Sequence, residues 1–245
     1  MKILFGILIF LIAWQIFAAI LNVPLILPSP YLTFKSLYNL ALQQETYQAI
    51  FSTVWKSLLV LLMVIAIGTP VGFLMGISES VYQIFRPAIT VVQAVPVISW
   101  LALVIFVWGI GWKGPVVISF LSLLPISIFT TAAGVRSTDK SLIEMARVYK
   151  VPQVKIIRTI YLGSLVPFVF STVEVIIGDV WKVIVVSEYL CGSDGIGVLI
   201  SWARQYVDVP RIYALTIIAV TLGIASERLV KIAFKKVLEK WQMQS

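Results

Sequence analysis

Histidine is absent from the 245-residue chain, and cysteine occurs once, as Cys191. These absences exclude histidine-based acid–base catalysis, histidine metal sites and disulfide bonds within the chain. The sequence also lacks the pattern G-x-x-x-x-G-K-[ST], whose backbone amides cradle nucleotide phosphates. We therefore expect no catalytic residue, no metal site and no bound cofactor, and we do not expect the chain to be an enzyme.

Charged residues are also scarce. They make up 12% of the sequence, whereas hydrophobic residues make up 60% and the mean hydropathy is +1.01. Soluble domains carry about 25% charged and about 45–50% apolar residues. The polar surface is thus too small to cover a water-exposed globule, and the surplus apolar surface must face lipid. The composition predicts an all-α integral membrane protein in which residues 1–245 form a single domain.

Long apolar runs occupy most of this sequence, and about 20 such residues let a helix cross the hydrocarbon layer. Six runs approach or reach this length, at residues 3–22, 54–77, 87–108, 115–135, 165–186 and 213–230. The first run also has a faint secretory cleavage site at Ala18-Ala19, but its apolar core is too long for a signal, so we expect a retained helix. Residues 1–50 then hold this helix and an external segment, and residues 51–245 form the core.

Positive charges are unevenly distributed over the segments between these runs. If the N-terminus lies inside, the cytoplasmic segments contain 13 of the 19 basic residues and five of the 11 acidic ones. Cytoplasmic loops of membrane proteins carry such an excess of Lys and Arg. The formal net charge of +8 is therefore a topology signal, and no binding to nucleic acid is expected. It places both termini of a multi-pass protein in the cytoplasm.

The external segment between the first two runs has a different composition. Its sequence Leu27-Pro28-Ser29-Pro30 favours an extended backbone. Residues 31–48 are predicted to form an amphipathic helix on the external surface of the membrane.

The longest cytoplasmic segment, residues 136–163, is too polar to enter lipid but has a helical pattern. One apolar helical face, at i, i+3, i+4 and i+7, is formed by Leu142, Met145, Ala146 and Tyr149. Ser137 and Thr138 are candidate N-caps of this helix. Ser141 with Glu144 three residues later also fits a capping box.

Pro152 divides this segment into two parts. It disfavours helical geometry at Val151, so the first helix, from Asp139, is expected to end there. Pro152 also suits the first position of a second short helix over residues 152–162. The result is an elbow, residues 136–163, below the membrane. Its apolar stripe fits either a groove on another protein or the surface of anionic lipid headgroups, since it is flanked by Arg147, Lys150, Lys155 and Arg158.

The elbow resembles the EAA loop of ABC importer permeases. The resemblance lies in Glu144-Met145-Ala146-Arg147 and in Pro167 about twenty residues later. Gly134-Val135-Arg136-Ser137 is similar to the sequence that enters this loop. Three further stretches resemble the nitrate, sulfonate and taurine branch of the family: Leu27-Pro28-Ser29-Pro30, Trp181-Lys182-Val183-Ile184-Val185-Val186-Ser187-Glu188 and Gly195-Ile196-Gly197.

This resemblance implies a function and a set of partners. The chain would be the transmembrane permease subunit of an ABC importer in a prokaryotic plasma membrane, with residues 51–245 as its core transport domain. The elbow would dock on a separate ATPase subunit that holds ATP and Mg²⁺. The implied coupling residues are Glu144, Met145, Ala146, Arg147, Lys150 and Pro152. The other implied partners are a second permease subunit, identical or related, and an external solute-binding protein.

Two positions depart from the family pattern. Lys150 stands where the family has Gly, at the bend between the two short helices. If this bend is left-handed, a residue other than Gly costs about 1–2 kcal/mol there. The family's Leu-Pro after the second helix is Leu162-Gly163 in this chain, and Gly163 is expected to break the helix and leave a looser joint.

The fifth apolar run contains or borders four charged residues, Glu174, Asp179, Lys182 and Glu188. Intramembrane charges are costly and face the protein interior or water. Glu174 is expected to line the translocation path, with a structural pair that locks helices together as the alternative. Asp179 and Lys182, at i and i+3, are expected to pair with each other, with path lining as the alternative. The resemblance places Glu188 near the outer gate, in either a gating or a structural role.

These charges also bear on the solute. Three acids against one base favour a neutral or cationic organic solute, such as a vitamin or its pyrimidine precursor, over nitrate or a sulfonate such as taurine.

Small residues and prolines give further expectations. Close helix packing is predicted for a stripe at four-residue spacing, Gly68, Gly72 and Gly76. Gly195 and Gly197 lie in an outer loop, where flexibility would help the binding protein to dock. Pro96 and Pro125 are expected to kink their helices.

Two other functions fit parts of the sequence. A self-contained secondary transporter or channel would use the charges of the fifth run for ion coupling and would need no ATPase. A membrane scaffold would move no solute and would gather cytoplasmic partners on its basic elbow.

Overall fold

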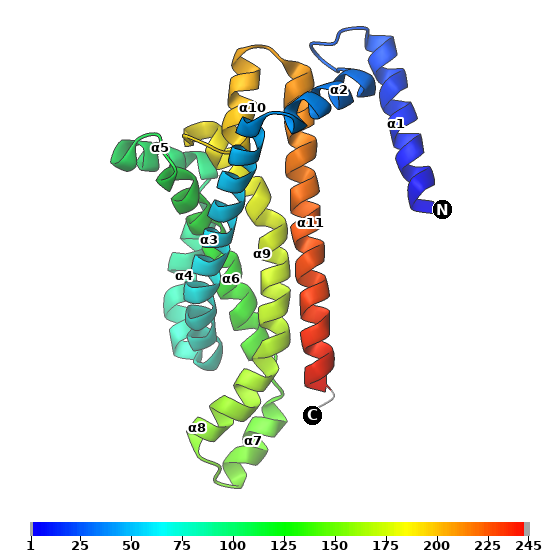
Figure 1. The fold of residues 1–245 in the computed structure, drawn as a ribbon. Coiled ribbons are helices and arrows are strands. Elements are labelled where there is room, and N and C mark those ends of the chain that lie inside the picture. The colour runs from blue at the N-terminus through cyan, green and yellow to red at the C-terminus, as the bar shows by residue number, and fades with distance from the viewer. Residues whose placement is uncertain (1, 243–245) are drawn as a thin grey trace.

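The computed structural model describes the backbone of residues 2–242, and every element in that range is a helix (Figure 1). The helices are α1 (Lys2–Leu21), α2 (Pro30–Ala41), α3 (Gln44–Ile77), α4 (Glu79–Ala94), α5 (Val97–Trp108), α6 (Lys113–Arg136), α7 (Lys140–Val148), α8 (Gln153–Ile156), the π-helical turn η1 (Ile157–Tyr161), α9 (Leu162–Cys191), α10 (Ile196–Gln205) and α11 (Val209–Gln242). The predicted all-α fold is confirmed for the described residues.

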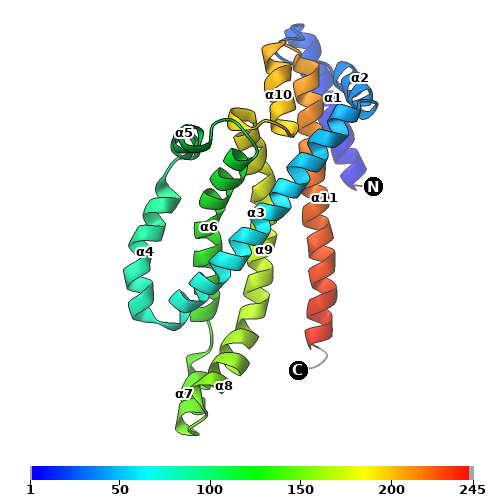
Figure 2. The same cartoon turned by 60° about the vertical axis from the view of Figure 1, so that its left-hand side comes forward.

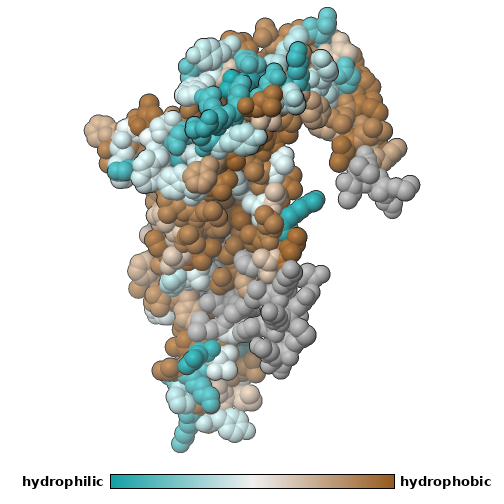
Figure 3. All heavy atoms as spheres, in the orientation of Figure 1, coloured by the Kyte–Doolittle hydropathy of each residue, from teal (hydrophilic) through white to brown (hydrophobic). Residues whose placement is uncertain are grey.

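The longest helices run between two ends of the molecule. The elbow, with α7 and α8, projects at one end, and α2 and α10 lie at the other, the far end (Figures 1 and 2). On the face in Figure 3, hydrophilic residues gather toward both ends and hydrophobic residues cover the middle. Among the described helices α3, α6 and the Val209–Ala233 part of α11 are long and apolar enough to cross a membrane by themselves. These features are those of a multi-helix membrane protein.

The third predicted run, residues 87–108, does not form one straight span. The chain breaks before Pro96, and α4 and α5 meet at an angle of 86°. Proline lacks a backbone N–H and disfavours helical geometry in the residue before it, so the expected kink at Pro96 is a complete break. Pro125, in contrast, lies inside the uninterrupted α6.

The number of membrane crossings stays a prediction for two helices. The 20-residue α1 is apolar after Lys2, and the part of it whose side chains the structure describes, Phe5–Leu21, is shorter than the helices named above. The 30-residue α9 is long enough, about 45 Å at 1.5 Å per residue, but it carries the four charged residues of the fifth run. If the bent α4–α5 pair counts as one span, four spans are supported by length and composition among the described residues.

The packed centre of the molecule consists of α3, α6 and α9. The main hydrophobic cluster includes fully buried side chains of α3 and α9, namely Val60, Val64, Ile176 and Ile184. The glycine stripe of α3 faces α6, since added side chains at Gly68, Gly72 and Gly76 would collide with Ser127, Ile128 and Val135. The predicted role of the stripe in close packing is confirmed.

The segment that was predicted to be external forms a shorter helix than expected. Instead of residues 31–48, α2 covers Pro30–Ala41, and α3 already begins at Gln44. Ser29 determines the start of α2, because its Oγ accepts a hydrogen bond from the backbone N–H of Leu32 at 3.4 Å. The chain turns between Ala41 and Gln44, so the last predicted residues of the helix belong to α3.

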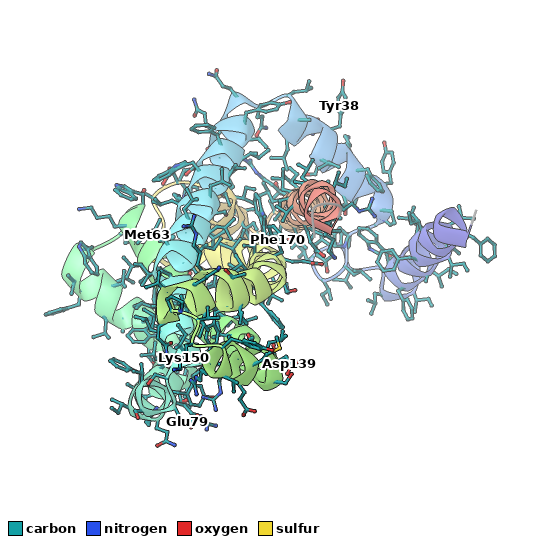
Figure 4. The ribbon with its side chains drawn as sticks, turned by 90° about the horizontal axis from the view of Figure 1, so that it is seen from below. Tyr38, Met63, Glu79, Asp139, Lys150 and Phe170 are labelled. Carbon is teal, nitrogen blue, oxygen red and sulfur yellow. The ribbon has the colours of Figure 1, made fainter. Side chains whose placement is uncertain are left out.

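The first helix, α1, stands apart from the other long helices over most of its length (Figures 1 and 4). Trp14 stacks on Tyr213 with ring centroids 6.1 Å apart, and its Nε1 donates to the carbonyl of Pro28. Most other described side chains of α1 are exposed, and Phe10, Phe17 and Ile20 are each more than 60% exposed. Its apolar surface is therefore available to lipid or to another subunit.

Candidate functional site

The elbow begins with a cap that the sequence analysis did not identify. Asp139, rather than Ser137, Thr138 or Ser141, is the N-cap of α7. Its Oδ1 accepts hydrogen bonds from both the hydroxyl and the backbone N–H of Ser141, at 2.8 Å each. These bonds hold the pKa of the Asp139 carboxyl below its usual value. A carboxylate at this position stabilises the free amides of the first turn.

The bend after α7 is left-handed at Lys150, so the condition stated for this position is met. Lys150 has φ +54°. Its N–H donates to the carbonyl of Arg147, and the N–H of Val151 donates to the carbonyl of Ala146, both at 2.9 Å. This is the Schellman arrangement that closes helices, usually with Gly at the left-handed position. The bend is therefore preserved with a lysine, at a local cost of about 1–2 kcal/mol.

The second arm of the elbow differs from the prediction of a separate helix over 152–162. A single α-helical turn, α8, passes into the wider η1 and then directly into α9, with Gly163 inside the helix. The expected break at Gly163 is wrong, because one glycine costs only about 1 kcal/mol in a helix and does not by itself end it. As a result, the elbow is joined to α9 by continuous helical backbone.

The side chains of the elbow differ widely in their exposure to solvent. Ala146 in the first arm and Ile156 in the second are buried, so Ala146 is not part of the exposed surface of the predicted apolar face. Met145 is 53% exposed and Tyr149 77% exposed, and other exposed apolar side chains are Leu142, Val148 and Val154. The predicted residues Glu144, Arg147, Lys150 and Pro152 are exposed as well. Figure 4 looks onto this end, with Asp139 and Lys150 marking the start of α7 and the bend after it.

An open cavity of about 740 Å³, the groove, lies along α9, α10 and α11. The predicted path residues Glu174, Asp179 and Lys182 line it. The predicted pair is confirmed, since Lys182 Nζ lies 2.9 Å from Asp179 Oδ1. Lys231 of α11 binds two carboxylates, Glu174 at 2.8 Å and Glu227 at 2.7 Å. Most of the other lining is apolar, so the groove combines hydrophobic walls with paired charges.

The acids of the fifth run have lysine partners on other helices, but these lysines are shared. Lys231 of α11 binds Glu174 and also Glu227. Lys56 of α3 binds Glu188 and also Asp194. The groove therefore holds three carboxylates, those of Glu174, Asp179 and Glu227, against the two ammonium groups of Lys182 and Lys231. The balance within one run could not show these partners, which weaken the argument against an anionic solute without removing it.

At the far end, Glu188 is 1% exposed and lies in a network of hydrogen bonds. Lys56, which is fully buried, places Nζ 3.0 Å from Glu188 Oε1. Thr53 donates to the same carboxylate at 2.9 Å, and the N–H of Gly197 donates at 3.1 Å. The Thr53 hydroxyl also accepts the N–H of Ile196 at 2.9 Å. This network, the clasp, joins α3, α9 and α10.

The clasp extends to the surface through Asp194. Lys56 Nζ lies 2.7 Å from the Asp194 carbonyl and 3.1 Å from its Oδ1, and Ser52 donates to Oδ2 at 2.6 Å. The Asp194 side chain is 50% exposed. Partial burial alone would raise the pKa of Asp194, but the hydrogen bonds from Ser52 and Lys56 outweigh it and hold that pKa below its usual value.

Gly195 and Gly197 pack against the clasp. Gly195 has φ +118°, and a side chain there would collide with the Glu188 carboxylate. At Gly197 a side chain would collide with the carbonyl of Val185. Both residues thus allow close approach of backbone to Glu188, a different physical basis from the expected flexibility.

The sequence has counterparts in other proteins. Residues 68–239 match the family described as "Binding-protein-dependent transport system inner membrane component". A probable ABC transporter permease protein of Brucella abortus (strain 2308) is 27% identical over 217 residues, which are 89% of this chain and 86% of that protein. The putative aliphatic sulfonates transport permease protein SsuC of Bacillus subtilis (strain 168) is 25% identical over 218 residues, 89% of this chain and 78% of that protein.

A solved structure has the same fold. A chain of a bacterial ABC transporter involved in the import of the acidic polysaccharide alginate superposes with a TM-score of 0.67, at 15% identity and with 96% of each chain covered. The family match extends over more than half of the sequence and includes the elbow and the groove. The chain belongs to the family of binding-protein-dependent transport system inner membrane components, the permeases of ABC importers.

Proposed function

We propose that the chain is one of two permease subunits of an importer, and that it passes a small solute along the groove of α9 and α11 when a separate ATPase moves its elbow. The observation that carries this proposal is the elbow: it exposes apolar side chains and is joined to α9 without a break. A force on α8 is therefore passed directly to a helix that lines the groove, and a force on α7 reaches this helix through the bend at Lys150.

The exposed face of the elbow supports a protein partner. Met145 and Tyr149 are apolar yet largely exposed, and basic residues such as Arg147 flank them. This combination is typical of a helix that lies in a groove on another protein. The elbow also projects beyond the neighbouring ends of α4 and α6, away from the band of hydrophobic surface (Figures 2 and 3). This position favours an ATPase, which binds ATP and Mg²⁺, over lipid headgroups.

The charges of the groove support a path shared with a second permease subunit, identical or related. In the single chain the side chains of Glu174, Asp179 and Lys182 are 43%, 38% and 77% exposed. A charged side chain at the centre of a bilayer costs about 2.5–3.5 kcal/mol even on a permissive scale, so this face is a poor surface for lipid. A second subunit across the groove would enclose an aqueous path, and α1 offers it a further apolar surface.

The far end faces outward in this proposal, so both termini lie in the cytoplasm and the external solute-binding protein meets the loop that carries Gly195. The solute belongs to the class transported through such permeases, for instance a sulfonate, taurine, nitrate, or a vitamin or its pyrimidine precursor. The groove acids Glu174 and Asp179 have lysine partners, but Lys231 is shared with Glu227, so the charge of the groove separates these candidates only weakly.

The test is the recovery of the cognate ATPase with the tagged permease from detergent-solubilised membranes. Met145→Asp should lower the recovered ATPase at least tenfold, because a carboxylate is costly to bury in an apolar groove. Gln153→Asp adds the same charge at an exposed polar position of the elbow and should keep recovery within twofold. Both variants should insert into the membrane at the wild-type level.

Three results would contradict the proposal. Equal recovery of the ATPase with Met145→Asp and with wild type would remove the coupling role of the elbow. Solute transport by the reconstituted chain without any ATPase would establish a secondary transporter or channel. Recruitment of cytoplasmic proteins with no solute movement under ATP turnover would establish a scaffold.

A further inference from the structure

Lys56 uses its whole hydrogen-bonding capacity on one short stretch of the far end. An ammonium group has three donors, and three acceptors lie within 3.1 Å: Glu188 Oε1, the Asp194 carbonyl and Asp194 Oδ1. The side chain is completely buried and comes from α3, whereas its acceptors belong to the end of α9 and the loop that follows. Lys56 therefore holds this loop, residues 192–195, against two helices at once.

The two carboxylates of the clasp, those of Glu188 and Asp194, differ in their exposure to solvent and to a docking protein. Glu188 is enclosed, and its oxygens accept from Lys56, Thr53 and Gly197. Asp194 is half exposed at the far end and is fixed from below by Lys56 and Ser52. The clasp thus has a closed inner half and an outer half that an approaching protein can touch.

We propose that Lys56 is a positioning residue: it keeps the loop 192–195 fixed on the ends of α3 and α9, so that the external solute-binding protein, docking on this loop, moves α3, α9 and α10 as one body. The inference rests on the proposed function. A clasp that opened in every cycle would leave the buried charges of Lys56 and Glu188 without partners. The clasp therefore stays closed during transport, and the pivot of the motion lies nearer to the elbow.

The experiment uses the assembled importer in lipid vesicles, with the ATPase rate measured with and without saturating, solute-loaded binding protein. Asp194→Asn removes the charge from the outer half of the clasp and leaves the Lys56–Glu188 pair in place. It should lower the stimulation ratio about fivefold. Glu45→Gln is the matched control, because Glu45 is also a half-exposed acid of the far end and lies outside the clasp. It should keep the wild-type ratio.

A double variant separates positioning from stability. Lys56→Met leaves Glu188 buried and unpaired, so it should lower both the melting temperature and the stimulation ratio. Lys56→Met with Glu188→Met removes both charges and should recover most of the melting temperature, since apolar residues of similar volume often replace a buried ion pair without loss. The stimulation ratio of the double variant should stay low. Recovery of both quantities would overturn the inference, because the clasp would then be structural only.

A reversible cross-link tests whether the clasp stays closed. Ser52 Oγ and Asp194 Oδ2 are 2.6 Å apart, so Ser52→Cys with Asp194→Cys, in a Cys191→Ala background, places two thiols near each other. A small shift joins them in a disulfide, since a cysteine sulfur lies one bond short of the aspartate oxygen it replaces. The reduced protein should show the low ratio of Asp194→Asn, and disulfide formation should restore the ratio toward that of the Cys191→Ala parent. A disulfide that blocks stimulation would show that the clasp must open, and would overturn the inference.

These outcomes are independent of the coupling role of the elbow. If Asp194→Asn and the double variant keep the wild-type ratio within twofold while Met145→Asp still loses the ATPase, the clasp inference is wrong and the proposed function stands. If the wild-type permease binds no ATPase, the proposed function fails first.

Discussion

The far end and the elbow treat charged and apolar groups in opposite ways. At the far end the charged residues Lys56 and Glu188 are buried and bonded on all sides. At the elbow the charged residues are in water, and apolar side chains such as Met145 and Tyr149 are exposed beside them. A buried, fully bonded network allows one arrangement, whereas an exposed apolar face is completed by a partner. The far end is built to stay fixed and the elbow to be completed by another subunit.

One helix connects these two ends. The backbone from α8 through η1 to the end of α9 is helical throughout, and α9 carries the groove charges on its way to Glu188. Because of this connection, a displacement of the exposed elbow by its partner can move the closed clasp as well. The predictions below test the difference between the two ends, in order of decreasing effect.

The largest effect is expected from Lys56→Met at the far end. It leaves the Glu188 carboxylate buried without its cation, and removal of one partner of a buried pair costs about 3–5 kcal/mol. The free energy of unfolding, measured in mixed micelles, should fall by this amount. Lys113→Met is the control, because Lys113 is exposed and belongs to no described ion pair. A loss below about 1 kcal/mol would mean that the clasp is solvated and not a closed network.

Gly195→Ala should have the next largest effect. The φ of +118° is nearly closed to other residues, and the new side chain would meet Glu188, so we expect a loss of about 1–3 kcal/mol. Gly111→Ala is the matched control, since nothing lies within 4 Å of a side chain there and its φ is not positive. Thermal unfolding of the two variants side by side measures the difference. Equal melting temperatures would show that the loop is free to move, as the glycines in the sequence predicted.

The sequence predicted the elbow better than the far end, for a physical reason. The elbow is made of neighbouring residues, so periodicity, Pro152 and the Gly position occupied by Lys150 were enough to place its first helix and the bend. The pair of Asp179 and Lys182 was predictable in the same way, because three residues separate them in one helix.

The clasp could not be predicted, because its partners are far apart in the chain. Lys56 and Glu188 are 132 residues apart, and no local pattern joins them. In the sequence, Lys56 is a single charge near the start of the apolar run 54–77, and Glu188 is a charge just after the run 165–186. A buried lysine is stable only beside an acidic partner, but the sequence does not show which acid is the partner. The same limit explains the incomplete charge balance of the groove, where Lys231 and Glu227, both of α11, were missing from the count.

At the elbow, Lys150→Gly should raise stability slightly. The change removes about 1–2 kcal/mol of left-handed strain but adds about 0.5–1 kcal/mol of backbone entropy to the unfolded chain. The net gain, about 0.5–1 kcal/mol, should appear as slower hydrogen exchange of the amides of α7. Lys150→Asn removes the same charge and should change exchange less, since Asn tolerates this conformation better than Lys but not as well as Gly. Faster exchange in the glycine variant would show that the lysine side chain itself holds the bend.

The smallest effect is expected from an ion pair near the elbow with the same chemistry as the clasp. Arg136, the last residue of α6, lies 2.7 Å from Glu79 of α4 and over the ring of Tyr82 at 4.3 Å. The side chains of Arg136 and Glu79 are 37% and 58% exposed, and such pairs contribute only about 0.2–1 kcal/mol.

Glu79→Gln should therefore lower the unfolding free energy by less than about 1 kcal/mol, and added salt should reduce even this difference because exposed charges are screened. Glu188→Gln, the same chemical change in the clasp, should cost several times more and should not respond to salt. Urea or SDS unfolding of the two variants at low and high salt measures both quantities. Equal losses would mean that burial does not distinguish the two ends, and the contrast between a fixed far end and an adaptable elbow would have to be abandoned.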